Sequence, residues 1–257
     1  MRRSKFVRRS AVAATAVSLA LLVTACGGEA KDDAAPEETA KADSSAPAAD
    51  APAPAAEVLS ADELEKALVV QGDVEGFKVK KPMDAALKML ETGSVTTDKA
   101  ECEPLARLVI SFKLGEPAAT AATQATAELD KKNLFDMKST MIGLSSYEGK
   151  GAEETLASVR TAGGACADGF TYTVGAETTK VTKVEELKVS GGDEATGWVV
   201  TTEVDGEKMP YHAGLVRQGS TLAAFPTLNL GSAVTGKDSD FPAALATAQV
   251  EKLAKQG

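Results

Sequence analysis

The single histidine of the chain, His212, is the residue best suited to acid–base chemistry. An imidazole changes its charge near neutral pH, so His212 could act as a general base or as a pH switch. Any Ser-His-Asp triad would have to be built around it. We select His212, its neighbour Tyr211 and the nearby Arg217 as candidate ligand-binding residues. We favour a strand position without a catalytic role for His212, and we assign no catalytic residue.

Motifs that mark common active sites are absent from the sequence. It contains no GxxxxGKS or GxxxxGKT phosphate loop, no GxGxxG, no HExxH and no GxSxG. The pairs Gly163-Gly164 and Gly191-Gly192 are predicted to end a helix and a strand rather than to cradle phosphate. The pairs Glu153-Glu154 and Glu185-Glu186 are interpreted as solvated surface, because adjacent side chains point apart. We therefore predict neither a cofactor nor a metal.

The composition excludes two further classes of site. The 257 residues include 37 acidic and 28 basic side chains, a net charge of −9. Nucleic-acid binding needs a surplus of lysine and arginine, so we predict no nucleic-acid partner. One histidine cannot supply a histidine-rich zinc site, and the three cysteines lack CxxC spacing.

The first 25 residues are predicted to be an export signal. They carry five basic residues and no acidic one, and the run Ala11 to Ala25 is uncharged. Such a basic and then apolar leader is typical of secretory signal peptides, and it is shorter than the roughly 20 apolar residues of a membrane span. The run ends in Leu22-Val23-Thr24-Ala25-Cys26, which resembles the bacterial lipobox. The alternative is an ordinary signal peptide with a cysteine beside its cleavage site.

The lipobox resemblance implies that Cys26 receives a diacylglyceryl group and becomes the first residue of the mature chain. Membrane lipid would then be a partner through acylated Cys26, and the protein would lie on the extracytoplasmic face of the cell membrane. Residues 26–57 are predicted to be a disordered tether, because 27–57 hold 12 alanines and four prolines but no aromatic, Leu, Ile or Val. Residues 58–257 are predicted to form a single globular domain.

Two cysteines remain for the domain once Cys26 is assigned to lipid, namely Cys102 and Cys166. Exported chains seldom keep two unpaired thiols, so we expect a disulfide between them. Metal binding by the two thiols is the alternative.

The periodicity of apolar residues predicts helices first and consecutive strands later. Ser60 and Glu63 have the spacing of a capping box, and Asp205-Gly206 is a strong hairpin signal. Further helices are predicted over 99–110, 151–163 and 241–256, and strands over 134–147, 170–174, 179–189, 198–204, 209–217 and 221–225. The stretch 120–129 suits either state. This order indicates an α+β fold with an antiparallel sheet.

Four segments occur in an order that resembles a group of actinobacterial surface lipoproteins and, more broadly, the PknH-like extracellular sensor domain. They are Cys102-Glu103-Pro104-Leu105, Leu144-Ser145-Ser146-Tyr147-Glu148, Ala152 to Arg160 with Cys166, and Gly219-Ser220-Thr221-Leu222. The resemblance implies a twisted antiparallel sheet flanked by helices, disulfide linkage and a cleft for a ligand. This chain has one cysteine pair where the kinase sensor domain has two. No functional residue is carried over.

Three classes of function remain open. The first is a sensor-like domain that binds a small molecule, lipid or cell-wall fragment in a cleft. The second is an interaction module that binds an envelope protein during envelope assembly, and the third is a cell-wall hydrolase with an unrecognised site. We expect the first, without chemistry on the ligand, and we expect the strands from Trp198 to Phe225 to form the floor of the cleft.

Overall fold

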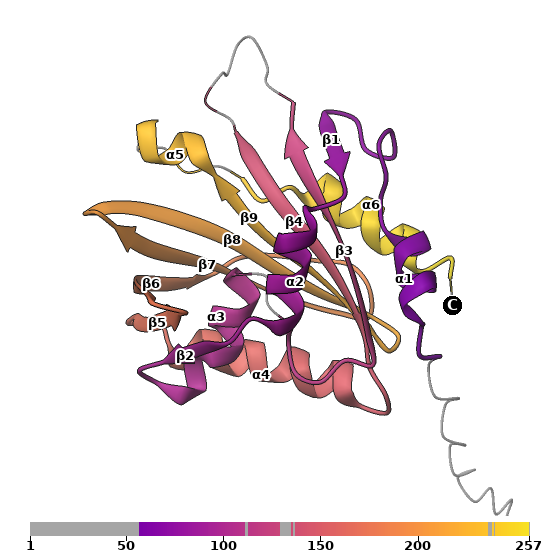
Figure 1. Ribbon diagram of the computed structural model, residues 1–257, viewed down its shortest axis with the longest axis horizontal. Helices are drawn as coiled ribbons and strands as arrows, with labels where there is room; N and C mark the ends of the chain where they lie inside the picture. Colours follow the sequence, from indigo (N-terminus) through magenta and orange to yellow (C-terminus); the bar gives the residue numbers. More distant parts are fainter. Residues whose placement is uncertain are drawn as a thin grey trace, which may run out of the picture. The chain divides into compact units, whose positions relative to one another are not determined.

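The computed structural model describes residues 57–110, 113–128, 135, 137–235, 238 and 240–256. The predicted signal peptide, the lipidation site Cys26 and the predicted tether up to residue 56 lie outside these residues. The described residues form a nine-stranded antiparallel sheet with helices packed on it (Figure 1). The α+β fold expected from the sequence is therefore confirmed.

The sheet follows the order β1-β3-β4-β9-β8-β7-β6-β5-β2. Its strands are β1 (Phe77–Lys80), β2 (Val95–Thr97), β3 (Ala119–Ala127), β4 (Lys138–Ser146), β5 (Phe170–Val174), β6 (Glu177–Glu186), β7 (Glu194–Val204), β8 (Glu207–Gln218) and β9 (Thr221–Asn229). Strands β5 to β9 are neighbours in the sheet in the order of the chain, and β4 lies beside β9. The short edge strands β1 and β2 come from the first part of the domain.

The helices are α1 (Ala61–Ala67), α2 (Asp84–Thr92), α3 (Glu103–Val109), α4 (Gly151–Ala165), α5 (Leu230–Thr235) and α6 (Ala243–Leu253), and a 3₁₀ turn at Ala100–Cys102 leads into α3. Within the described ranges, none of these helices has the length and apolar character to cross a bilayer.

Two local signals in the sequence have the predicted structural effect. Ser60 caps α1, and its side chain and that of Glu63 exchange hydrogen bonds with each other's backbone N–H groups, as in a capping box. Asp205 and Gly206 both have positive φ, 51° and 85°, and join β7 to β8. Positive φ at both positions is the backbone of a type I′ hairpin turn.

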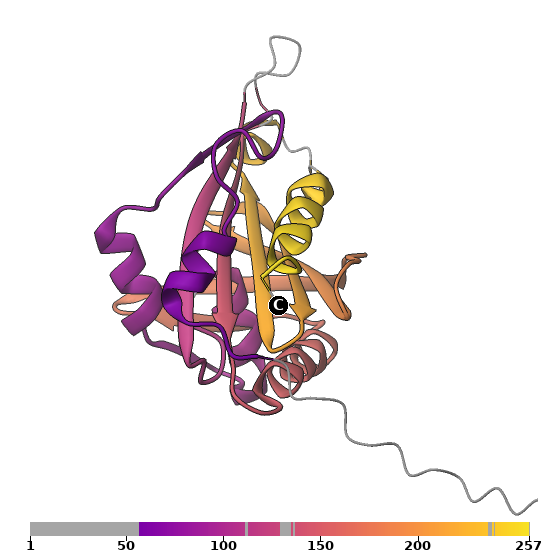
Figure 2. The same ribbon diagram turned by 90° about the vertical axis from the view of Figure 1, so that its right-hand side faces the viewer.

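The alternation of side chains along the strands gives the sheet two covered faces. On one, which we call the disulfide face, Ala213 and Leu215 of β8 pack with α3 and α4. On the other, which we call the α6 face, Val216 and Phe225 pack with α1 and α6. Figure 2 shows α6 and α2 on opposite sides of the sheet. A residue's position along its strand therefore determines which of the two cores it enters.

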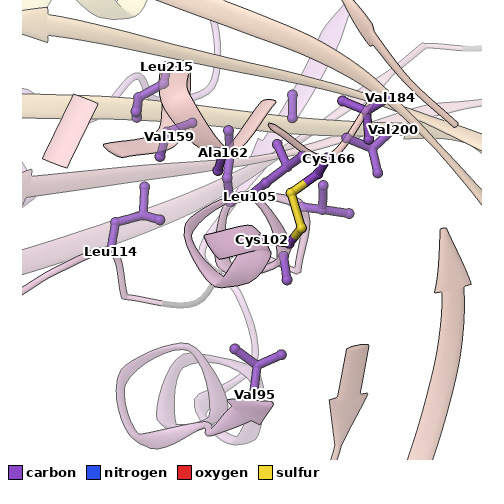
Figure 3. Close-up of a cluster of buried hydrophobic side chains, with 14 of the residues drawn as sticks. Val95, Cys102, Leu105, Leu114, Val159, Ala162, Cys166, Val184, Val200 and Leu215 are labelled. Atoms are coloured by element: carbon purple, nitrogen blue, oxygen red, sulfur yellow. A yellow bond between two sulfur atoms is a disulfide. The ribbon is translucent and has the colours of Figure 1, made fainter. Parts of the chain in front are cut away.

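The expected disulfide is present and lies in the core of the disulfide face. Cys102 and Cys166 are bonded, with their Cα atoms 6.0 Å apart, and both are fully buried (Figure 3). The bridge joins the start of α3 to the end of α4, next to Leu105 and Val200. It fixes both helices over the same half of the sheet.

Helix α4 corrects one prediction. The Gly163-Gly164 pair does not end the helix, which continues to Ala165. Gly163 lies against Trp198 of β7, and a Cβ atom at this position would come within 2.0 Å of the indole ring. The glycine is required for close packing of helix on sheet, not for a helix stop.

Other differences concern short or ambiguous segments. The stretch 120–129 belongs to a strand, β3, and the elements β1, α2, β2 and α5 were not predicted. The part of the predicted strand 134–147 that precedes residue 137 lies largely outside the described residues. The strand predicted over 179–189 ends at Glu186, because the chain then leaves the sheet before β7.

Candidate ligand-binding site

An apolar cavity lies on the disulfide face of the sheet, over β3, β4 and β9. It encloses about 120 Å³, less than the range of about 300–1,000 Å³ typical of pockets for drug-sized ligands. Helices α3 and α4 pack against β6 to β9 on this face. The cavity lies next to them, and of its three floor strands β9 has the most contact with these helices.

The floor of the cavity is hollow because three small residues stand side by side in neighbouring strands. Ala122 of β3 is paired with Gly143 of β4, and Gly143 is paired with Ala224 of β9. A Cβ atom added at Gly143 would have no described atom within 4 Å, its chain neighbours aside. In the next strand, β8, the residue paired with Ala224 is Leu215, whose large side chain is buried in the core of the disulfide face. The cavity thus begins where the row changes from large to small side chains.

Glycines elsewhere in the sheet have a different surrounding. A Cβ atom at Gly197 of β7 would lie 2.4 Å from Val189, and one at Gly214 of β8 would lie 2.6 Å from Phe241. Both positions face packed side chains, so glycine serves close packing there. Gly143 instead faces open space.

The walls and roof of the cavity are apolar. Leu108 of α3 and Leu114 line one side, and Leu87 of α2 lies on the cavity as well. Helix α2 is loosely packed, because none of its described side chains, at positions 84–89, is buried. Met89 is 52% exposed, and Met83, which precedes the helix, is 79% exposed. An apolar ligand would therefore gain contacts with a helix that is incompletely packed on its own.

Tyr147 fixes the position of Leu114 in the wall of the cavity. Its hydroxyl group donates a hydrogen bond of 2.8 Å to the Leu114 carbonyl oxygen, and its ring is buried. Burial raises the pKa of Tyr147 to about 12, partly offset by hydrogen bonds with Ser145 and Thr155. The phenol therefore stays protonated and remains a donor at neutral pH.

The cavity lining also includes charged side chains, and each of its lysines forms an ion pair that is at least partly exposed to solvent. Lys81 lies 3.5 Å from Glu65, and their side chains are 67% and 61% exposed. Lys113 also lines the cavity and pairs with Glu116 at 3.2 Å, where the glutamate side chain is 93% exposed. Exposed pairs of this kind contribute only about 0–1 kcal/mol, so the ammonium groups can change partners at little cost.

The three candidate residues chosen from the sequence do not come together. Tyr211 faces the core of the disulfide face, whereas His212, the next residue of β8, points to the α6 face. Arg217 is six residues beyond Tyr211, a separation of roughly 20 Å along a strand. None of the three lines the cavity. A role in ligand binding for each of them stays a prediction.

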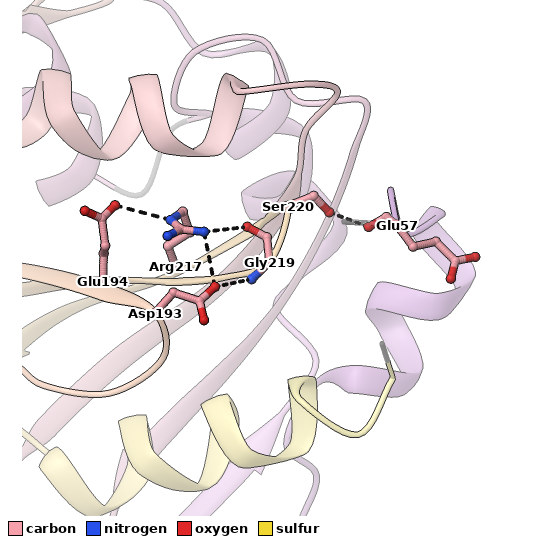
Figure 4. A network of polar contacts seen from close by, with 6 residues as sticks. All are labelled: Glu57, Asp193, Glu194, Arg217, Gly219 and Ser220. Carbon is pink, nitrogen blue, oxygen red and sulfur yellow. Dashed lines mark hydrogen bonds and ion pairs between the residues drawn. The ribbon is translucent and has the colours of Figure 1, made fainter. Parts of the chain in front are cut away.

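Arg217 is occupied by contacts within the protein. Its guanidinium group contacts Asp193 at 3.1 Å and Glu194 at 3.3 Å, and it donates to the Gly219 carbonyl oxygen (Figure 4). The Asp193 carboxylate also accepts the Gly219 N–H group. These contacts fix the turn between β8 and β9. The next residue in that turn, Ser220, donates to the carbonyl oxygen of Glu57, where the described chain begins.

His212 is buried and lies 3.2 Å from the Asp238 carboxylate. Tyr211 is half-buried, and burial raises its pKa. In the described part of the chain, no group of three or more His, Cys, Asp or Glu side chains is arranged to hold a metal ion.

The cavity-forming residues were not selected from the sequence. Ala122, Gly143 and Ala224 carry no functional group, and only the register of three strands brings them together. Of the strands from Trp198 to Phe225 that we expect to form the floor of a cleft, only Ala224 lines this cavity, which extends toward β3 and β4 instead.

Comparison with known proteins gives one informative likeness. No protein-family model and no curated protein matches the chain. Among solved structures, the extracellular domain of PknH from Mycobacterium tuberculosis aligns with a TM-score of 0.51 and 12% identity, over 77% of this chain and 98% of that domain. The fold resembles that extracellular domain. An uncharacterized Mycobacterium smegmatis protein, the Rv0999 ortholog, aligns with a TM-score of 0.35 and 14% identity, over 79% of this chain and 96% of that chain. The resemblance expected from the sequence is thus confirmed for the fold.

Proposed function

We propose that this protein is a lipid-anchored extracytoplasmic domain that binds an apolar ligand in the cavity over β3, β4 and β9 without transforming it. The observation that carries the proposal is the row of Ala122, Gly143 and Ala224, which leaves the sheet uncovered beneath an apolar wall. Burial of an apolar ligand there gains about 0.8 kcal/mol for each methylene group removed from water.

Three features support an extracytoplasmic location. The buried Cys102–Cys166 disulfide belongs to the chemistry of oxidising compartments. The leader that ends in Cys26 is consistent with export and acylation. An acylated Cys26 with two or more chains would hold the domain at the membrane durably. The likeness in fold to an extracellular domain agrees with this location.

Binding without chemistry is supported by the position of the acid–base candidate. His212 points to the α6 face, on the other side of the sheet from the cavity, and contacts Asp238. The side chains that surround the cavity are mainly aliphatic or small. They provide shape and apolar surface for a ligand.

The proposal is tested by filling the cavity. The exported chain with Cys26→Ala, purified without detergent, should bind the neutral fluorescent probe N-phenylnaphthylamine with a saturable gain in fluorescence. Gly143→Leu should weaken this binding about tenfold or more, because its side chain adds four carbon atoms and the loss of even two buried ligand methylene groups costs about 1.6 kcal/mol. The thermal midpoint should not fall, since a Cβ atom at this position meets no described atom within 4 Å and the rest of the side chain enters the cavity.

A matched control places the same side chain outside the cavity. Thr126 of β3 is exposed and alternates in phase with Ala122, but it does not line the cavity. Thr126→Leu should leave probe binding unchanged. No binding by the parent chain, or equal binding by Gly143→Leu, would overturn the proposal. The anchor is tested separately: the chain with Cys26 should be found in the membrane fraction, and Cys26→Ala outside it once its leader has been removed. Retention of Cys26→Ala without its leader would refute acylation.

A further inference from the structure

We infer that the ligand of this cavity is an anionic amphiphile, with an apolar chain over the row of small residues and a carboxylate or phosphate head group at Lys81 and Lys113. This inference rests on the proposed function, since it names the chemical class of the ligand bound at the same site.

The charges at the cavity favour an anion. The charged residues that line it are Lys81, Lys113 and Glu65, so the lining carries a surplus of positive charge. The whole chain has a net charge of −9. The lining is therefore more positive than the average surface, and an anionic group there would compete with Glu65 and with Glu116, the partner of Lys113, for the two ammonium groups.

The two lysines are available to a ligand because their present partners hold them weakly. Glu65 contacts Lys81 at 3.5 Å with both side chains mostly in water. Glu116 pairs with Lys113 but is almost fully exposed and does not line the cavity. When a ligand binds, each lysine would replace its exposed glutamate partner with the anionic head group of the ligand, whose apolar chain is buried. Such an exchange costs little and adds charge-assisted hydrogen bonds.

The dimensions of the floor fit a chain that lies across the strands. Lys81 directly follows β1, the strand that pairs with β3 at this edge of the sheet. From Ala122 to Ala224 the row crosses two strand-to-strand spacings, or about 10 Å. An apolar chain that begins at the edge of β3 would follow this row to Ala224 of β9. Thr120 and Ser145 also line the cavity, and a threonine hydroxyl group can donate to an oxygen-rich head group.

The experiment compares probes that share one chain and differ in the head group. Dodecanoate, dodecyl phosphate, dodecanol and dodecyltrimethylammonium are titrated, below their micelle concentrations, against the exported Cys26→Ala chain loaded with N-phenylnaphthylamine. The inference predicts that the anionic probes displace the fluorescent probe about five- to tenfold more tightly than dodecanol, and the cationic probe more weakly. Comparison of dodecanoate with dodecyl phosphate identifies which anion is preferred.

Variants assign the preference to the two lysines. Lys81→Gln combined with Lys113→Gln should lower the affinity for the anionic probes to that for dodecanol and leave dodecanol unchanged. The matched control is Lys180→Gln with Lys183→Gln, which removes two lysines from exposed ion pairs of β6 and makes the same change in net charge. This control should keep the preference.

The outcomes separate the inference from the proposed function. Equal affinity for dodecanoate, dodecyl phosphate and dodecanol, or a preference that survives in the cavity double variant, overturns the inference and leaves apolar binding intact. Failure of every probe to displace N-phenylnaphthylamine in the Gly143-sensitive site overturns both.

Discussion

The two adjacent glycines of α4 differ in what an added methyl group would meet. A Cβ atom at Gly163 would lie 2.0 Å from Cε2 of Trp198, whereas one at Gly164 would meet nothing within 4 Å. Both positions are inside the helix, which ends at Ala165. The helical gain from alanine is therefore the same at both positions, and only the contact with Trp198 differs.

The size of each effect follows from these two contributions. Replacing glycine with alanine inside a helix stabilises by about 0.5–1 kcal/mol. Gly164→Ala should raise the free energy of unfolding by this amount and the thermal midpoint by about 1–4 °C. Gly163→Ala has the same helical gain, but overpacking against a fixed ring costs about 1–3 kcal/mol. A net loss of about 1–2 kcal/mol is expected.

Urea unfolding of both variants measures the difference between their free energies of unfolding. A double-mutant cycle with Trp198→Phe then tests whether the indole ring causes this difference. Trp198→Phe removes the fused ring that the new methyl group would strike, so Gly163→Ala should cost at least about 1 kcal/mol less in that background. Equal stabilisation by both alanines would refute the close packing of α4 on β7. A cost of Gly163→Ala that is independent of residue 198 would refute its assignment to the indole ring.

Three further perturbations test the folded domain. Serine at both Cys102 and Cys166 should lower the free energy of unfolding by about 4 kcal/mol, because the bridge links residues 64 apart; a loss below about 1 kcal/mol in urea unfolding would contradict this. Gln249→Leu should lower the free energy of unfolding by about 3 kcal/mol in the same assay. The buried amide accepts a hydrogen bond from one backbone N–H group and donates one to a carbonyl oxygen at the end of α1, and leucine leaves both groups unpaired. An unchanged free energy of unfolding would argue against these contacts. Burial raises the pKa of Tyr147 to about 12, above its unfolded value of about 10. The folded state therefore retains that proton longer, and stability that is complete below pH 10 should fall by up to about 1.4 kcal/mol per pH unit between pH 10 and 12; Tyr147→Phe should reduce this slope, and an unchanged slope would count against the assignment.

Features that depend on neighbouring residues could be predicted from the sequence. The capping box of Ser60 and Glu63 and the hairpin turn at Asp205-Gly206 require only a few consecutive residues with known conformational preferences. The disulfide followed from elimination, since Cys102 and Cys166 remain once Cys26 is assigned to lipid. The antiparallel sheet followed from consecutive alternating segments after residue 166.

Features that depend on pairing over long distances could not be predicted. Strands β1 and β2 are only four and three residues long, and each pairs with a strand far along the chain. The cavity has the same origin: Ala122, Gly143 and Ala224 are unremarkable alone and form a hollow only in one register of three strands. Gly163 appeared as a helix end because its close neighbour, Trp198, is remote in sequence.

The most direct test of the central claim is the position of a bound apolar chain. NMR of the exported Cys26→Ala chain, labelled at methionine and alanine methyl groups and titrated with dodecanoate, measures which methyl groups contact the ligand. We predict intermolecular nuclear Overhauser effects to the methyl groups of Met141, Ala122 and Ala224, which line the cavity. Contacts confined to Ala246 in the core of the α6 face, or the absence of any intermolecular contact at saturating ligand, would contradict the proposed site.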